Sequence, residues 1–149
     1  KRILDATEFF APLVKDFPLK ELPEKVVYQE ACHLANMQKI REQPRQILKA
    51  IPGIELQEMT EPTMCCGSAG IYNILEPEMA GKLGNRKANS VEETLATIVV
   101  TTNPGCHLQL ESHLANGQVR VAHILELLDE AYMYAPNHDA NAPEGSAAL

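Results

Sequence analysis

Apolar residues along this chain follow two spacings, one typical of β-strands and one typical of helices. Short runs rich in β-branched residues predict strands at residues 25–29, 54–59, 97–102 and 118–121. Amphipathic stretches predict helices at residues 4–14, 44–50, 77–95 and 124–131. The run at 97–102 is almost continuously apolar, which indicates a central strand that is buried on both faces.

The order of these elements predicts the fold class. Strands that alternate with helices of this length form right-handed crossovers in a parallel sheet. We therefore expect a Rossmann-like three-layer α/β domain with a short, mainly parallel sheet and helices on both faces. Residues 25–135 would form this domain and residues 1–24 an N-terminal helix and linker. Residues 136–149 are small and polar without apolar periodicity, and we expect a disordered tail there.

Composition and charge narrow the range of functions. The chain has 149 residues, of which 45% are hydrophobic and 22% charged, and this suits one globular domain. Its net charge of -7, without a Lys/Arg run, argues against a nucleic-acid partner. No stretch approaches the roughly 18 consecutive apolar residues of a membrane helix, and the start lacks a signal-peptide pattern. We therefore expect a cytosolic protein without a transmembrane segment, and, because no Met opens the chain, further residues upstream.

The four cysteines follow three different predicted strands. Cys32 comes after the first strand, Cys65 and Cys66 after the second, and Cys106 after the third. The loops that leave the carboxyl ends of parallel strands open on one edge of the sheet, where such folds bind their ligands. We therefore expect the cysteines to lie in loops at this edge and to converge on one site.

Four thiolates at one site suit either zinc or an iron-sulfur cluster. Neighbouring side chains diverge, so the adjacent Cys65 and Cys66 favour a cluster over a single tetrahedral ion. Gly67 and Gly70 allow backbone angles that other residues resist, and amides in this loop, together with Ser68, can donate hydrogen bonds to sulfur. Such donors would lower thiol pKa values and tune a redox potential.

Other interpretations of the same residues remain open. A free cysteine can be a small buried hydrophobe, and an adjacent thiol pair can form a thiol-disulfide site without metal. His33 and His107 each follow a cysteine directly and are alternate ligands or donors to the ligands. The loop at 66–70 can also form an anion nest for a phosphate or a flavin pyrophosphate, and residues 103–105 can be only a tight turn.

Three motifs carry a family resemblance. They are Cys32-His33-Leu34, Met64-Cys65-Cys66-Gly67-Ser68-Ala69-Gly70 and Asn103-Pro104-Gly105-Cys106-His107-Leu108-Gln109-Leu110, in that order. Residues 26–128 resemble the CCG cysteine-rich domain of glycolate oxidase iron-sulfur subunits, lactate-utilisation iron-sulfur proteins and heterodisulfide reductases. Stretches at 41–45, 51–53 and 123–128 are most similar to the C-terminal part of a glycolate oxidase iron-sulfur subunit.

The resemblance implies an electron-transfer subunit that is not catalytic alone. Its partners would be a flavin-containing subunit that oxidises a 2-hydroxy acid such as glycolate, and other subunits of a complex at the inner face of the cell membrane. Cys32, Cys65, Cys66 and Cys106 would bind a 4Fe-4S cluster, or alternatively a structural zinc ion. Some relatives end the last motif with CxxC, whereas Gln109 stands at that position here, and this argues against a five-cysteine noncubane cluster.

Overall fold

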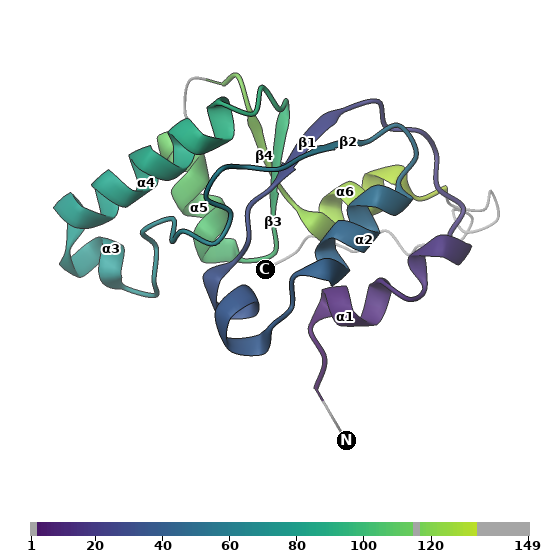
Figure 1. The fold of residues 1–149 in the computed structure, drawn as a ribbon, viewed down its shortest axis with the longest axis horizontal. Coiled ribbons are helices and arrows are strands. Elements are labelled where there is room, and N and C mark those ends of the chain that lie inside the picture. The colour runs from purple at the N-terminus through teal and green to yellow at the C-terminus, as the bar shows by residue number, and fades with distance from the viewer. Residues whose placement is uncertain (1–2, 115–116, 134–149) are drawn as a thin grey trace, which may run out of the picture.

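The core of the fold is a parallel sheet of four strands in the order β2-β1-β3-β4. The structure is a computed structural model that describes residues 3–114 and 117–133 (Figure 1). The strands are β1 Lys25–Tyr28, β2 Glu55–Gln57, β3 Ile98–Thr101 and β4 Arg120–His123. The expected α/β fold is therefore confirmed, with β3 inside the sheet. The disordered tail expected at 136–149 lies outside the described residues.

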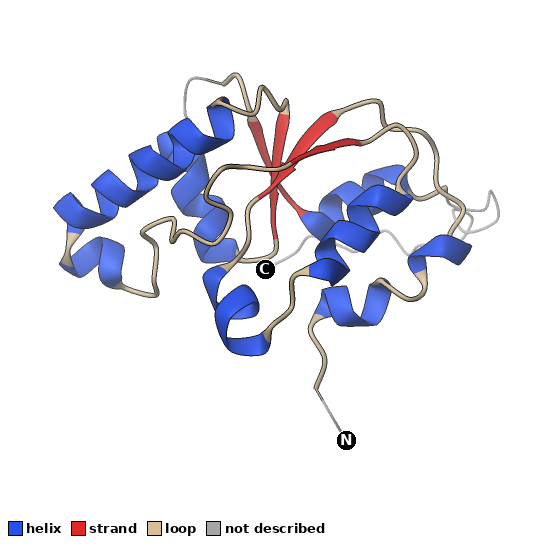
Figure 2. Ribbon diagram, in the orientation of Figure 1, coloured by secondary structure: helices blue, strands red, loops and turns tan. Residues whose placement is uncertain are grey.

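Helices cover both faces of the sheet (Figure 2). They are α1 Ala6–Phe10, α2 Glu42–Ala50, α3 Tyr72–Leu75, α4 Pro77–Glu92, α5 Pro104–His113 and α6 Ile124–Ala131, with a 3-10 turn η1 Val14–Asp16 and a π-helical segment η2 His33–Gln38. The patterns predicted α1, α2, α4 and α6, whereas η2, α3 and α5 were not predicted. No described helix is long and apolar enough to cross a membrane.

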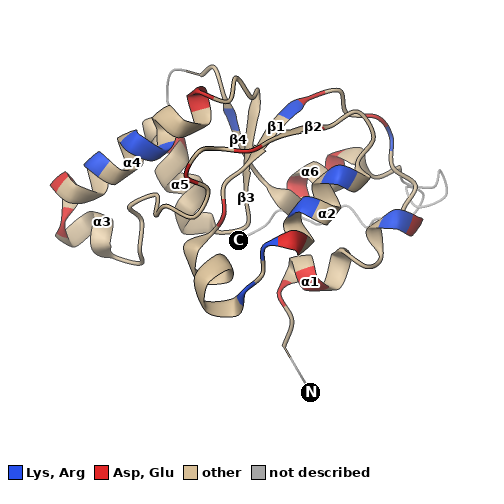
Figure 3. Ribbon diagram, in the orientation of Figure 1, with Lys and Arg blue, Asp and Glu red and all other residues tan. Residues whose placement is uncertain are grey.

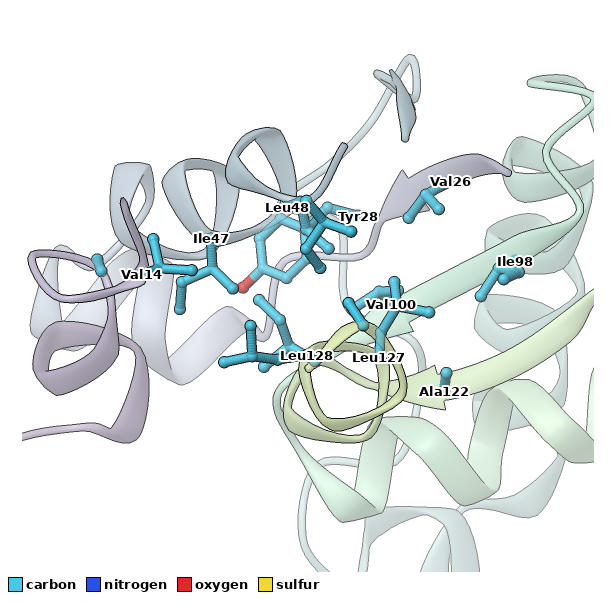
Figure 4. Close-up of a cluster of buried hydrophobic side chains, with 14 residues drawn as sticks. Val14, Val26, Tyr28, Ile47, Leu48, Ile98, Val100, Ala122, Leu127 and Leu128 are labelled. Carbon is cyan, nitrogen blue, oxygen red and sulfur yellow. The ribbon is translucent and has the colours of Figure 1, made fainter. Parts of the chain in front are cut away.

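One face of the sheet packs against α2 and α6, and α1 packs on α2. Side chains alternate along a strand, so Val26 and Tyr28 of β1 point to this face and Val27 points to the other. Figure 4 shows Tyr28 beside Ile47 and Leu48 of α2, with Leu127 and Leu128 of α6 beneath them. This cluster anchors the strands on the side away from α4 and α5.

The opposite face packs against α4 and α5. Val27 and Val99 of the two central strands meet Val91 of α4 and Leu110 of α5 in a second cluster. The His113 ring of α5 lies against the backbone of α4 at Gly84, where a Cβ would clash with it. This approach fixes the position of α5, whose first turn carries Cys106.

Buried polar groups tie the two central strands together at their carboxyl ends. Thr101 Oγ1 donates a hydrogen bond of 2.8 Å to Gln29 Oε1, and Gln29 Nε2 donates one of 2.6 Å to the carbonyl of Glu30. All three residues are buried. Since buried polar groups are costly unless they are paired, these bonds favour one conformation at the point where two cysteine-bearing segments leave the sheet.

We expect Leu127→Ala to destabilise the protein by about 2 to 5 kcal/mol, because it leaves a cavity under the sheet. Leu127 is 0% exposed, whereas Leu108, the matched control, is 67% exposed. Leu108→Ala should change the free energy of unfolding by less than about 0.5 kcal/mol. Urea unfolding of both variants checks this, and equal losses would contradict the core assignment.

Candidate metal centre

The four cysteines surround one cavity at the carboxyl edge of the sheet. The cavity has a volume of about 360 Å³ and is lined by Cys32, His33, Cys65, Cys66, Ser68, Ala69, Gly70, Asn103, Gly105 and Cys106. All four cysteines are free thiols; Cys66 and Cys106 are buried, and Cys32 and Cys65 are partly exposed. Three segments that are far apart in the sequence thus bring their thiols to one place.

The other predicted site residues differ in where they lie. His33 and Ser68 line the cavity beside the cysteines. Gly67 is adjacent to it in the loop, and its N–H donates a hydrogen bond of 3.4 Å to Cys65 Sγ. His107 instead lines a separate cavity with Leu108 and lies 3.3 Å from a carboxylate oxygen of Glu111.

Cys32 and Cys106 are presented by the ends of helical segments. Cys32 directly precedes η2, and Cys106 lies in the first turn of α5, where its N–H donates a hydrogen bond of 3.0 Å to Asn103 Oδ1. Residues 103–105 are therefore the start of a helix, and the interpretation of them as only a tight turn is wrong. The sequence explains why a helix begins here, because Asn is a preferred N-cap residue and Pro is favoured at the first helical position, which Pro104 occupies.

Two glycines allow the loop at Cys65 and Cys66 to press against its neighbours. Gly67 has φ +92°, and a Cβ there would stand 2.5 Å from the Ala80 carbonyl oxygen of α4. A Cβ on Gly105 would stand 2.8 Å from Ser68 Oγ, so the loop also touches the start of α5. A side chain at Gly67 would force the loop or α4 to shift, because the atoms that it meets belong to the backbone of Ala80.

The thiols interact in two pairs. The hydrogen bond to Cys106 lowers the pKa of the Cys66 thiol to about 6, despite its burial, and raises the pKa of Cys106. Burial raises the pKa of Cys65, which also pairs with Cys32, while the Gly67 amide acts in the opposite direction. The Cys66 thiol therefore loses its proton more readily than an ordinary cysteine. Metal binding requires deprotonated cysteine ligands.

The donor set fits a thiolate-bound metal group. Four soft sulfur donors around one cavity match the ligand type and number of zinc sites and of iron-sulfur clusters. Across residues 3–114 and 117–133, no three Cys, His, Asp or Glu side chains are arranged to hold one ion. The thiols share a cavity without meeting at a point, so a single ion would require them to move together.

Sequence patterns missed a buried lysine near the thiols. Lys87 of α4 is 0% exposed, and the charges of Cys66 and Cys106 are the largest electrostatic influences on it. Burial lowers its pKa to about 8, against the effect of these thiols. Its spacing of four residues from Leu83 and from Val91 on the apolar face of the helix was the available signal.

Gln109 is held by its own hydrogen-bond partners. Its side chain is buried and accepts a bond of 3.4 Å from Asn73 Nδ2, and its Nε2 lies 3.2 Å from His113 Nε2. The other ring nitrogen of His113 lies 2.9 Å from Asn85 Oδ1. A polar chain therefore links α3, α5 and α4 at the position that follows Cys106 by three residues.

Comparisons with known proteins place these residues in a family. The family model of the CCG cysteine-rich domain matches residues 26–111. The chain is 47% identical over 115 residues to the probable glycolate oxidase iron-sulfur subunit of Bacillus subtilis, covering 74% of this chain and 26% of that protein. It is 39% identical over 133 residues to a subunit of the fumarate reductase (CoM/CoB) of Methanothermobacter marburgensis, covering 87% and 27%.

A third relative extends the comparison. The glycolate oxidase iron-sulfur subunit of Escherichia coli is 31% identical over 124 residues, covering 80% of this chain and 29% of that protein. The chain therefore spans only between a quarter and a third of the length of these relatives.

We expect Gly67→Ala to destabilise the protein by roughly 2 to 4 kcal/mol, because it adds a clash with Ala80 to the strain of a positive φ. Gly70 is the matched control, since it has φ +69° and a Cβ there would meet no other atom within 4 Å. Gly70→Ala should cost only about 1 kcal/mol. Thermal unfolding of the two variants checks the difference, and equal costs would refute the close approach of loop and helix.

Proposed function

The chain belongs to the CCG cysteine-rich domain family, and on that premise we propose that it is an electron-transfer segment of an iron-sulfur subunit. Cys32, Cys65, Cys66 and Cys106 would hold one 4Fe-4S cluster. The observation that carries this proposal is the arrangement of the four thiols around a single cavity, contributed by three separate segments. A 4Fe-4S cluster has four irons at alternate corners of a cube, each of which binds one thiolate, and so suits sulfur donors that surround a cavity.

The chain's own residues would hold and shield such a centre. Cys66 and Cys106 provide buried ligands, which keep water from that side, while Cys32 and Cys65 lie toward solvent. The Gly67 amide donates to the Cys65 sulfur, and such bonds stabilise a thiolate and influence reduction potential. When bound, the cluster supplies reversible transfer of one electron. The exposed side is the natural route for electrons to enter and leave.

The names of the relatives support a proposal for the intact protein. Two of them are named as glycolate oxidase iron-sulfur subunits, and others as lactate utilization proteins. We infer that this chain works beside a flavin-containing subunit that oxidises a small 2-hydroxy acid such as glycolate. Electrons would pass through the cysteine centre toward a further acceptor, in a complex in the cytoplasm or at the inner face of the cell membrane.

The alternative is a structural zinc domain. Four thiols at one cavity also match a zinc site with four cysteine ligands, in which the metal would link three segments without a change of redox state. The surface would then serve only to dock other subunits.

Anaerobic purification should yield iron and acid-labile sulfide in roughly equal amounts, with a visible absorption band that dithionite bleaches. The reason is that thiolate-bound cluster iron accepts an electron and zinc does not. Metal and sulfide analysis with spectra before and after reduction provide the measurement. Stoichiometric zinc without sulfide would replace the electron-transfer proposal with the structural one.

Single Cys→Ser variants at positions 32, 65, 66 and 106 should each lose most of the bound iron, because a hydroxyl is a poor substitute for a thiolate ligand. His107→Ala is the control, since His107 lies outside the cysteine cavity. It should retain the iron content of the parent. Full iron retention by any of the four Cys→Ser variants would remove that cysteine from the ligand set.

A further inference from the structure

Lys87 occupies a place where a charged side chain is rare. It belongs to the face of α4 that packs toward the sheet, it is 0% exposed, and its neighbours Ala88 and Val91 lie in the second apolar cluster. Lysine is almost never fully buried without a partner for its charge. The ammonium group therefore needs a compensating interaction inside the protein.

Part of that compensation comes from the chain that leads into the cysteine loop. Lys87 Nζ donates hydrogen bonds of 2.8 Å to the Glu61 carbonyl and 3.0 Å to the Pro62 carbonyl. These residues precede the Cys65-Cys66 pair by only a few positions. The same helix meets the loop again where Gly67 approaches Ala80, so α4 holds the loop on both sides of the two cysteines.

The two carbonyls accept hydrogen bonds from two of the three ammonium N–H groups, but they do not neutralise the charge. In the described part of the chain, no carboxylate forms an ion pair with Lys87. The two carboxylates with an electrostatic influence on Lys87, those of Glu30 and Glu61, form ion pairs with other residues. Glu61 pairs with Arg86, and Glu30 pairs with Arg45 at 2.8 Å. The groups with the largest electrostatic influence on Lys87 are the Cys66 and Cys106 thiols.

The cysteine-bearing segments contain no Lys or Arg of their own. Residues 32–38, 62–75 and 103–110 contain no Lys, Arg, Asp or Glu. Figure 3 shows this as the tan ribbon of α3 and the loop before it, while charges of both signs lie on α4 and α2. A buried cation beside uncharged segments is stabilised when the thiols next to it become negative.

We propose that Lys87 is the counter-cation of the cysteine centre: it fixes the loop through two carbonyls, and its charge offsets part of the negative charge that four thiolates bring to the cavity. This inference rests on the proposed metal centre. Because reduction adds an electron to an already anionic centre, a fixed positive charge nearby makes the reduction potential less negative. Lys87 is thus a positioning residue with an electrostatic effect.

The test compares Lys87→Met and Lys87→Gln with Lys82→Met in the full chain. Met removes the charge and both hydrogen bonds, whereas Gln removes the charge and keeps an N–H donor. Lys82→Met removes one charge from the exposed side of the same helix, where Lys82 pairs with Glu78. Circular dichroism first establishes that each variant is folded. If Lys87→Met does not fold, both measurements are made on Lys87→Gln.

The first measurement needs no metal. In the metal-free chain, hydrogen exchange of the backbone amides in residues 61–67 is followed by mass spectrometry. Lys87→Met should exchange several-fold faster than the parent in this segment, because the loop loses both bonds from Lys87 Nζ, while Lys82→Met should match the parent. Unchanged exchange in both folded Lys87 variants would overturn the inference.

The second measurement is the midpoint potential of the iron-loaded chain. Both Lys87 variants should shift to more negative potential and Lys82→Met should not, whereas equal potentials in all forms would contradict the proposal. The two readings separate this inference from the proposed function. Faster exchange in a chain that binds no iron supports the role of Lys87 and rejects the cluster, while iron loading with unchanged exchange and potential rejects the role of Lys87 alone.

Discussion

The parallel pairing of β1 with β2 and β3 is the constraint on which the site depends. Parallel strands run in one direction, so the segments that follow them leave from one edge of the sheet. Cys32 follows β1, the adjacent Cys65 and Cys66 follow β2, and Cys106 follows β3. The sheet therefore brings together thiols that are more than 70 positions apart in the chain, Cys32 and Cys106 being the most distant pair.

Close packing then turns this common edge into a shaped cavity. Gly67 lets the cysteine loop approach α4, Gly105 lets it touch the start of α5, and Gly84 lets α4 and α5 approach each other. Lys87 adds hydrogen bonds from α4 to the entry of the loop. Each contact limits how far the loop can move, so the thiols are held near one another before any metal binds. This order reduces the conformational entropy that binding must overcome.

The sequence patterns were sufficient for the sheet and for the convergence of the cysteines. The β-branched run at 97–102 and the position of each cysteine after a strand are local signals, and both correspond to the structure. Helix α5 was missed because its apolar and polar residues do not separate onto two faces: Gln109 is buried while Leu108 is exposed. Lys87 was missed because its burial depends on the Glu61 and Pro62 carbonyls, which lie about 25 positions away in the chain.

Native mass spectrometry of the anaerobically prepared chain tests the central claim most directly, because it weighs the protein together with whatever its four thiols hold. The account predicts one added mass per chain that corresponds to a single intact cluster of four irons and four sulfides, and its loss when any of the four cysteines is replaced. A single zinc ion in its place, or a chain that carries no metal group at all, would contradict the account.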